Sequence, residues 1–157
     1  MPDTQTELSR ARLERTEFRR IAPAVDAALL AMGKAVAESG LEPALLELVK
    51  LRASQMNGCA FCVQYHTNLA RQAGVEREKL DLLPAWHDAG PYSARERAAL
   101  AWTEALTEMR AENEAAYACA VDAFGAEEVV FLTAAIANIN AWNRVAGGLR
   151  FSPPRAV

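Results

Sequence analysis

The chain lacks any long run of charge of one sign, and it has few cysteines, prolines, glycines and aromatic residues. Its 157 residues include 3 cysteines, 7 prolines and 8 glycines, and aromatic residues make up 7%. No Lys or Arg run is longer than the pair Arg19–Arg20, and the net charge is −3. Proteins that bind nucleic acid need a basic surface to neutralise phosphates. We therefore expect no nucleic-acid partner.

The sequence also lacks a hydrophobic segment suited to a membrane. Residues 1–20 are polar and charged, without the apolar core of a signal peptide. The longest apolar stretch, residues 129–142, is interrupted by Thr133, Asn138 and Asn140. A membrane-spanning helix needs about 20 predominantly apolar residues. We expect no membrane association and a cytoplasmic location.

The composition favours helices. Hydrophobic residues make up 52% of the chain and charged residues 24%, and Ala and Leu dominate the apolar set. These residues form helices more readily than strands. The length fits one domain with a sizeable core. We predict an all-α, single-domain helical bundle over residues 1–157, with about seven to eight helices.

Proline and glycine divide the chain into predicted helices. These helices cover residues 24–39, 44–56, 59–72, 76–83, 93–110, 112–124 and 126–144. Ser93 and Glu96 have the spacing of a capping box at the start of one helix, and residues 84–92 are predicted to form a loop. Four side chains at helical positions are predicted to lie in the core: Trp102, Tyr117, Cys119 and Trp142.

Two of the cysteines, Cys59 and Cys62, lie close together after the turn signal Asn57–Gly58. In a cytosolic protein such a pair is typical of redox chemistry or metal binding. If a helix begins at Cys59, both thiols lie in its first turn, with Cα atoms about 5–6 Å apart, which a disulfide tolerates. The positive end of the helix dipole stabilises a thiolate there.

A histidine and a glutamate have spacings that bring them to the same place. His66 follows Cys62 by four residues, so it shares a helix face with Cys62 and can exchange a proton with its thiol. Glu47 lies in an apolar segment, where a carboxylate is costly without a partner. If the two helices pack antiparallel, Glu47 reaches His66 and completes a Glu–His–Cys relay. Taken singly, His66 could be structural and Glu47 could pair with Lys50.

Metal binding is the main chemical alternative. The cysteine pair and His66 would supply three ligands, with Glu47 or His87 as a fourth. Structural zinc sites usually show a second, separated ligand pair, which this sequence lacks, and His87 is predicted to be a surface or structural residue. A covalent haem site needs His directly after the second cysteine, where Val63 stands. The residues favour a redox dithiol with no cofactor and no metal.

The pattern Glu47, Cys59, Cys62 and His66 resembles the active-site pattern of the alkylhydroperoxidase D-like (AhpD-like) group of the carboxymuconolactone decarboxylase family. Residues 48–59 (LVKLRASQMNGC) and 92–100 (YSARERAAL) are similar as well. The resemblance covers about residues 18–150, with 1–15 and 151–157 expected to be peripheral. It implies an AhpD-like helical bundle, assembly into trimers or hexamers, and peroxidase activity on a hydroperoxide with a dithiol reductant or redox partner protein.

The resemblance also implies a role for each site residue. Cys62 would attack the peroxide and become a sulfenic acid, Cys59 would resolve it to a disulfide, and Glu47 and His66 would relay protons. Phe61 stands where the best-studied branch has a second histidine, and Phe cannot move protons. The decarboxylase branch proper lacks the cysteine pair, so we do not expect lactone decarboxylation. The alternatives are a general disulfide reductase and a redox-sensing helical oligomer without peroxidase turnover.

Overall fold

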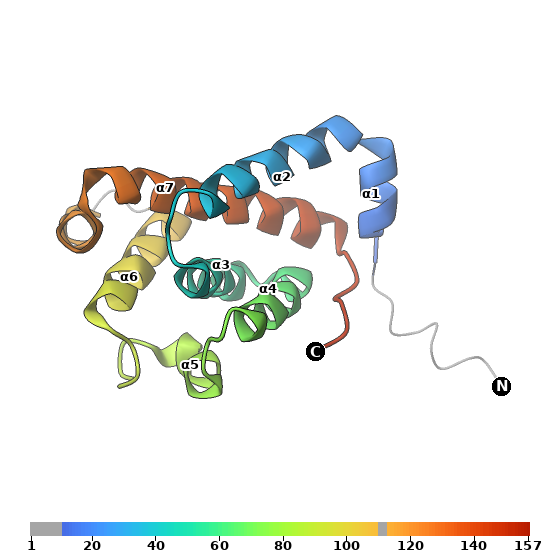
Figure 1. Cartoon of the computed structure of the whole chain (residues 1–157). Helices are drawn as coiled ribbons and strands as arrows, with labels where there is room; N and C mark the ends of the chain where they lie inside the picture. Colours follow the sequence, from blue (N-terminus) through green and yellow to red (C-terminus); the bar gives the residue numbers. More distant parts are fainter. Residues whose placement is uncertain (1–10, 110–112) are drawn as a thin grey trace.

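The computed structural model describes residues 11–109 and 113–157, and within these ranges it contains helices and no strand (Figure 1). The elements are α1 (Arg15–Ile21), α2 (Pro23–Ala37), α3 (Pro43–Asn57), α4 (Ala60–Gln72), α5 (Arg77–Leu82), a 3-10 turn (Leu83–Ala85), α6 (Ala94–Glu108) and α7 (Glu114–Leu149). The predicted all-α class is confirmed. No helix in the described part is long and apolar enough to cross a membrane.

The last two predicted helices are both present within α7, and they are separated, as predicted, by a kink at the non-helical Gly125. There φ is 71° and ψ is 171°, a conformation that glycine adopts without a Cβ clash. The prediction that the last helix ends near Arg144 was wrong, because α7 continues through two glycines to Leu149. Packing of this segment against the cysteine pair outweighs the low helix propensity of glycine. The predicted boundaries at Arg110 and Glu112 lie outside the described residues.

Two of the predicted core side chains are exposed. Cys119 and Tyr117 both lie on the solvent side of α7, whereas Trp102 is buried as predicted. The first half of α7 buries Ala120 and Phe124 on one face. Tyr117 and Cys119 lie off this face and are exposed. An Ala-rich helix is apolar on several sides, so its sequence does not identify the covered face.

Helix α3 lies at the centre of the bundle, where it packs against α4, α6 and α7 (Figure 1). Its residues 45–49 are all buried, so this part of the helix is covered on every side. Its buried residues are Leu45, Leu46, Glu47, Leu48, Val49, Leu51, Ala53 and Ser54. The helix therefore carries a glutamate into the interior of the protein.

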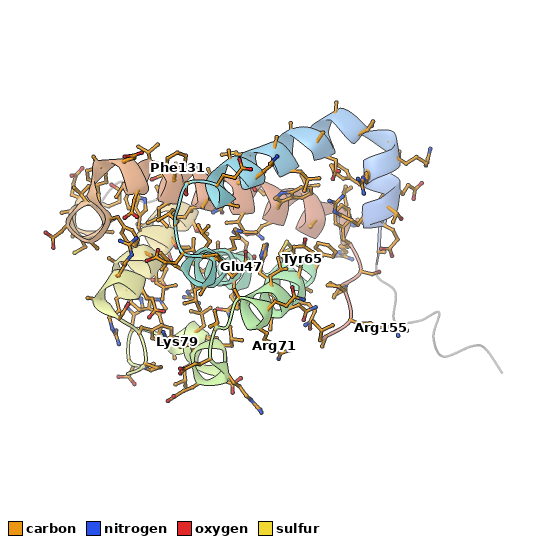
Figure 2. All side chains as sticks on the ribbon, viewed as in Figure 1. Glu47, Tyr65, Arg71, Lys79, Phe131 and Arg155 are labelled. Carbon is orange, nitrogen blue, oxygen red and sulfur yellow. A yellow bond between two sulfur atoms is a disulfide. The ribbon has the colours of Figure 1, made fainter. Side chains whose placement is uncertain are left out.

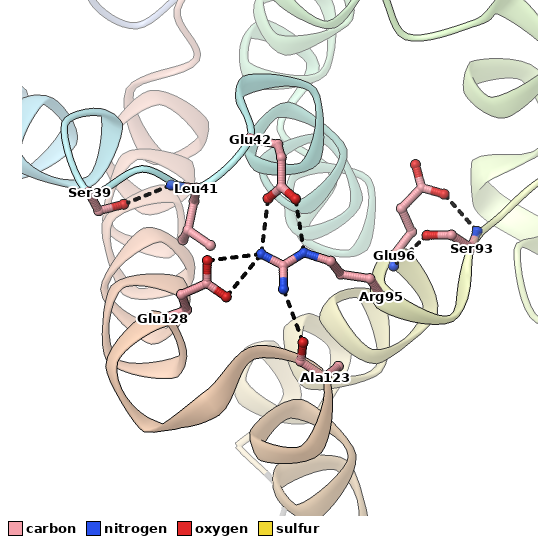
Figure 3. Close-up of polar contacts among 8 residues, drawn as sticks. All are labelled: Ser39, Leu41, Glu42, Ser93, Arg95, Glu96, Ala123 and Glu128. Atoms are coloured by element: carbon pink, nitrogen blue, oxygen red, sulfur yellow. Dashed lines mark hydrogen bonds and ion pairs between the residues drawn. The ribbon is translucent and has the colours of Figure 1, made fainter.

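Arg95 joins the first turn of α6 to two other helices (Figure 3). Its guanidinium donates to both carboxylate oxygens of Glu42, at 2.9 and 3.2 Å, and to Glu128 at 3.0 Å. It also donates to a main-chain carbonyl just before the kink of α7. Beside it, Ser93 and Glu96 form the predicted capping box. These contacts fix the start of α6 against α3 and α7.

An aromatic cluster joins the two ends of the described chain. Helix α1, which the sequence did not predict, buries Phe18 against Trp142 and Phe151, with ring centroids 6.3 and 5.7 Å apart. Phe151 follows α7 directly and meets the ring of Phe61 edge to face at 5.5 Å. Residues 151–157 then make hydrogen bonds to side chains of α4. Helix α1 and the segment after α7 thus pack around the cysteine pair.

Candidate active site

The two cysteines lie in the turn between α3 and α4. Gly58 ends α3 in the left-handed conformation, with φ 65°, which favours glycine at this position. Cys59 is the N-cap of α4, and its Sγ accepts the backbone N–H of Cys62 at 3.3 Å. The Cα atoms are 5.3 Å apart and the two residues form a disulfide. The pair therefore lies at the start of a helix, at a Cα distance that a disulfide tolerates, as the sequence predicts.

Hydrogen bonds to α7 hold this turn in place. The side-chain amide of Asn143 donates to Ser54 Oγ at 3.0 Å and accepts from Asn57 Nδ2 at 2.9 Å. The carbonyl of Ser54 in turn accepts the backbone N–H of Cys59 at 3.1 Å. Ser54 and Asn143 are both buried, and buried polar groups that satisfy one another restrict the local geometry. The position of the cysteine pair is therefore set by α7 as well as by its own turn.

The two cysteines differ in what they face, although both are buried, with 1% of Cys59 and 3% of Cys62 exposed. Cys62 lines a cavity of about 360 Å³, and Cys59 does not. The side chain of Cys59 points toward α7, where a Cβ added to Gly147 would lie 4.0 Å from its own Cβ. A small molecule in the cavity thus meets Cys62 first.

Glu47 and His66 are in direct contact, as the antiparallel arrangement of α3 and α4 predicts. His66 Nδ1 lies 2.7 Å from Glu47 Oε2, and Lys50 Nζ lies 2.7 Å from Glu47 Oε1. Burial alone would raise the pKa of Glu47, but the hydrogen bonds and positive charges of His66 and Lys50 outweigh it and lower that pKa. An ionised Glu47 accepts the Nδ1 proton, which leaves Nε2 as the basic nitrogen of His66.

The cavity lies between α2, α4 and α7, beside this Glu–His pair. Apolar side chains form most of its wall: Leu29, Leu30, Phe61, Tyr65, Leu69, Ile139 and Trp142. Figure 2 labels Glu47 on α3 and Tyr65 on α4, the two helices that lie below α2 in this view. His66 and Cys62 both reach the cavity from α4. The site thus combines a thiol pair, a hydrogen-bonded histidine and an apolar compartment.

Two aromatic rings of α4, Phe61 and Tyr65, pack next to Cys62 and His66. Phe61 directly precedes Cys62 and stacks on Tyr65, with centroids 5.8 Å apart and planes 11° from parallel. Tyr65 also contacts the edge of His66 at 5.2 Å. The phenyl ring of Phe61 has no proton to give, whereas His66 and Tyr65, which also line the cavity, have groups that can carry one.

The sequence did not assign every residue of the site. Lys50 was considered only as an alternative partner of Glu47, and in the structure it bonds to Glu47 together with His66. Its position three residues after Glu47, on the same helix face, is the signal that could have identified it. Trp142 was assigned to the core, yet it lines the cavity. The pattern of one helix does not show whether an apolar side chain lies in the core or lines a cavity.

His87 is not part of this site. It is exposed, its Nε2 lies 2.8 Å from Glu104 Oε2, and its ring stacks on Trp86. This agrees with the predicted surface or structural role. Within the described residues, no three His, Cys, Asp or Glu side chains are grouped so that they could hold a metal ion.

The sequence is similar to those of known proteins. The sequence model described as the Carboxymuconolactone decarboxylase family matches residues 23–105. The uncharacterized protein YdfG of Bacillus subtilis (strain 168) is 34% identical over 134 residues, which are 84% of this chain and 91% of that protein.

Solved structures show the same fold. One is a protein of unknown function from Agrobacterium tumefaciens, whose name suggests the antioxidant defence protein AhpD. It has a TM-score of 0.86 at 35% identity, and the match covers 93% of this chain and 99% of that protein. A peroxidase-related protein from Ralstonia eutropha JMP134, described as an alkylhydroperoxidase AhpD core, has a TM-score of 0.78 at 21% identity, over 88% of this chain and 75% of its own. The latter likeness concerns the fold alone.

Proposed function

The chain belongs to the carboxymuconolactone decarboxylase family, and we propose that it is a thiol-dependent peroxidase that uses Cys59 and Cys62. The observation that carries the proposal is the position of Cys62, which alone of the pair lines the cavity, next to His66. His66 is hydrogen-bonded to Glu47, whose lowered pKa keeps it ionised. The name of the Agrobacterium protein, which refers to antioxidant defence, supports the same assignment.

The first step is attack of the Cys62 thiolate on the terminal oxygen of a hydroperoxide. The S–O bond forms as the O–O bond breaks, and Cys62 becomes a sulfenic acid. His66 takes the thiol proton beforehand and gives it to the departing alkoxide, so that an alcohol leaves. Glu47 orients His66 through Nδ1 and stabilises its protonated form, and Lys50 keeps Glu47 ionised.

The second step is formation of the disulfide. The sulfur of Cys59 attacks the sulfenic sulfur of Cys62, the S–S bond forms, and the hydroxyl group leaves as water with the proton of the Cys59 thiol. The disulfide in the structure corresponds to this oxidised form. An external dithiol, either a small molecule or a redox partner protein, then supplies two electrons and two protons and restores both thiols.

Assembly of the chain into a trimer or hexamer stays a prediction. Measurement of the molecular mass in solution would test it.

Disulfide exchange without peroxide is the second candidate function, and Phe61 is the observation that favours it. A departing alkoxide needs a proton donor close to Cys62, and the phenyl ring of Phe61 supplies none. A departing thiolate is far less basic than an alkoxide and needs less help. The same cysteine pair would then pass electrons between dithiols and disulfides.

Peroxide consumption by the reduced protein, with a dithiol as electron donor, tests the proposal. Cys62→Ser should abolish turnover, and Cys59→Ser should leave a sulfenic acid at Cys62 that a dimedone-type reagent traps. Cys119→Ser is the matched control, because this exposed cysteine lies outside the site, and it should keep the parent rate. A normal rate in Cys62→Ser, or no consumption with any dithiol, would show that the peroxidase assignment is wrong. Turnover of disulfides alone would favour the second candidate.

A further inference from the structure

The charged side chains that line the cavity carry one sign. Among the described residues, the charged groups on its wall are Arg15, Lys34 and Lys50. Each has a carboxylate partner that does not line the cavity: Asp26, Glu38 and Glu47 respectively. A bound molecule therefore meets cations, one histidine and an otherwise mostly apolar wall. Such a surface suits a ligand that is apolar over most of its length and negatively charged at one point.

Two of the three cations are held firmly by their partners. Arg15 NH1 lies 2.6 Å from Asp26, which is buried, so moving this guanidinium away would leave a buried carboxylate with only the longer contact to Arg19, at 3.6 Å. Lys50 Nζ lies 2.7 Å from Glu47, and the proposed mechanism needs that contact. Neither cation can readily leave its carboxylate for a ligand.

Lys34 differs from the other two cations. Its ammonium lies 3.7 Å from Glu38, one turn further along α2, and 75% of its side chain is exposed. An exposed pair of this kind is weak and exchanges readily with solvent or another anion. Lys34 can therefore turn toward a negatively charged group that enters the cavity.

The burial of these groups gives the cavity a direction. Cys62 and His66 are almost fully buried, so the reacting atoms lie at the inner end. Lys34 is mostly exposed and lies at the solvent edge. The apolar side chains of α2, α4 and α7 line the space between them. A ligand whose oxidising group reaches Cys62 can thus extend its other end to Lys34.

We propose that the preferred substrates are hydroperoxides of amphipathic carboxylic acids, with the carboxylate at Lys34 and the apolar chain along the cavity. This inference rests on the proposed peroxidase function. The chemistry stays as written above, and the carboxylate takes no part in it. An exposed ion pair adds roughly a two- to five-fold preference for the acid over an uncharged ester, and that preference should fall as salt screens the charges.

Kinetics with matched substrates test the inference. The substrates are the hydroperoxide of a medium-chain fatty acid and the same hydroperoxide as its methyl ester. We expect the parent protein to have a KM for the acid roughly two- to five-fold below that for the ester. Lys34→Gln should remove the difference by raising the KM for the acid to the KM for the ester. Arg77→Gln is the matched control, because Arg77 forms an exposed pair with Asp81 one turn away and does not line the cavity. It should keep the preference.

Binding without turnover separates this inference from the proposed function. Trp142 lines the cavity, so its fluorescence should report a saturated fatty acid and its methyl ester in the disulfide form, with Trp142→Phe identifying the signal. Tighter binding of the acid by the parent, and equal binding of both by Lys34→Gln, would support the inference. Equal binding by the parent, or an unchanged preference in Lys34→Gln, would overturn it. Absence of peroxide turnover would count against the peroxidase function alone, since the binding result stands by itself.

Discussion

Two glutamates in this protein are each placed between a histidine and a cation, and only one of them lies beside a thiol. The pocket triad consists of Glu47, Lys50 and His66, and the outer triad consists of Arg52, His87 and Glu104. In both triads the glutamate contacts the histidine through Oε2 at 2.7 or 2.8 Å and the cation through Oε1 at 2.7 or 2.8 Å. Both triads include a residue of α3. The contacts of the two glutamates are thus almost the same, although His66 uses Nδ1 and His87 uses Nε2.

Electrostatics does not separate the two triads either. In each, burial alone would raise the pKa of the glutamate, and hydrogen bonds with neighbouring charges outweigh that effect and lower the pKa. For the outer triad the largest of these hydrogen bonds comes from the indole N–H of Trp86, at 2.7 Å. Both glutamates are therefore ionised at neutral pH.

The difference lies in what surrounds the histidine. The side chain of His66 is 11% exposed and faces the cavity beside Cys62, whereas the side chain of His87 is 64% exposed and stacks on Trp86. A hydrogen-bonded histidine can move a proton in either place, but only His66 has a thiol and a compartment for a substrate next to it. A Glu–His–cation arrangement therefore indicates a reactive site only together with its surroundings.

Replacement of each histidine by alanine should break the comparison with the largest effect. We expect His66→Ala to lower kcat/KM for a hydroperoxide by about 100-fold or more, because general acid–base groups contribute roughly 10²–10⁴-fold. His87→Ala should keep the parent value. Initial rates with saturating dithiol measure both. An equal loss in the two variants would mean that His66 has no special role in proton exchange.

Replacement of each glutamate by glutamine should give a smaller effect, on stability. Glu104→Gln leaves Arg52 without its carboxylate and weakens the bond from Trp86, so the free energy of unfolding should fall by about 1–3 kcal/mol. Glu47→Gln should lower the free energy of unfolding by a similar amount, because it leaves Lys50 without its carboxylate partner. Urea denaturation of the disulfide form measures both.

Activity separates the same two glutamine variants. Glu47→Gln should lose turnover together with stability, whereas Glu104→Gln should lose stability alone. A parent-like rate in Glu47→Gln at a temperature where the variant is folded would contradict the role assigned to the pocket triad.

Much of the pocket triad could be predicted from the sequence because its parts are close along the chain. A short turn between two helices makes them antiparallel neighbours, and Glu47 and His66 lie at matching distances from that turn. Residues in one helix turn, such as Cys59 and Cys62, have a spacing that the helix itself fixes. Local geometry was sufficient in both cases.

The rest of the site depends on contacts between distant segments. Lys34 and Trp142 reach the cavity because α2 packs on α7. Phe18 and Phe151 meet because α1 and the segment after α7 pack together beside the cysteine pair. Nothing in the local pattern of these helices specifies those partners. For the same reason the sequence placed Cys119 in the core: the pattern shows an apolar helix without showing which face is covered.

The pH dependence of stability should give the smallest effect, and it applies to both triads with the same sign. The pKa values of Glu47 and Glu104 lie below the ordinary value of 4.5. As pH falls through that value the unfolded chain binds protons first, so the stability contributed by each carboxylate is present above pH 4.5 and is lost as pH falls through the lowered, folded-state pKa. A protonated glutamic acid resembles glutamine in size and in its lack of charge.

The difference in unfolding free energy between the parent and either glutamine variant should therefore be largest near neutral pH and shrink in acid. Urea denaturation at several pH values measures it. A difference that stays constant with pH would mean that the variants lose packing and not an ionised carboxylate. The conclusion that both triads are stabilised by an ionised glutamate would then be wrong.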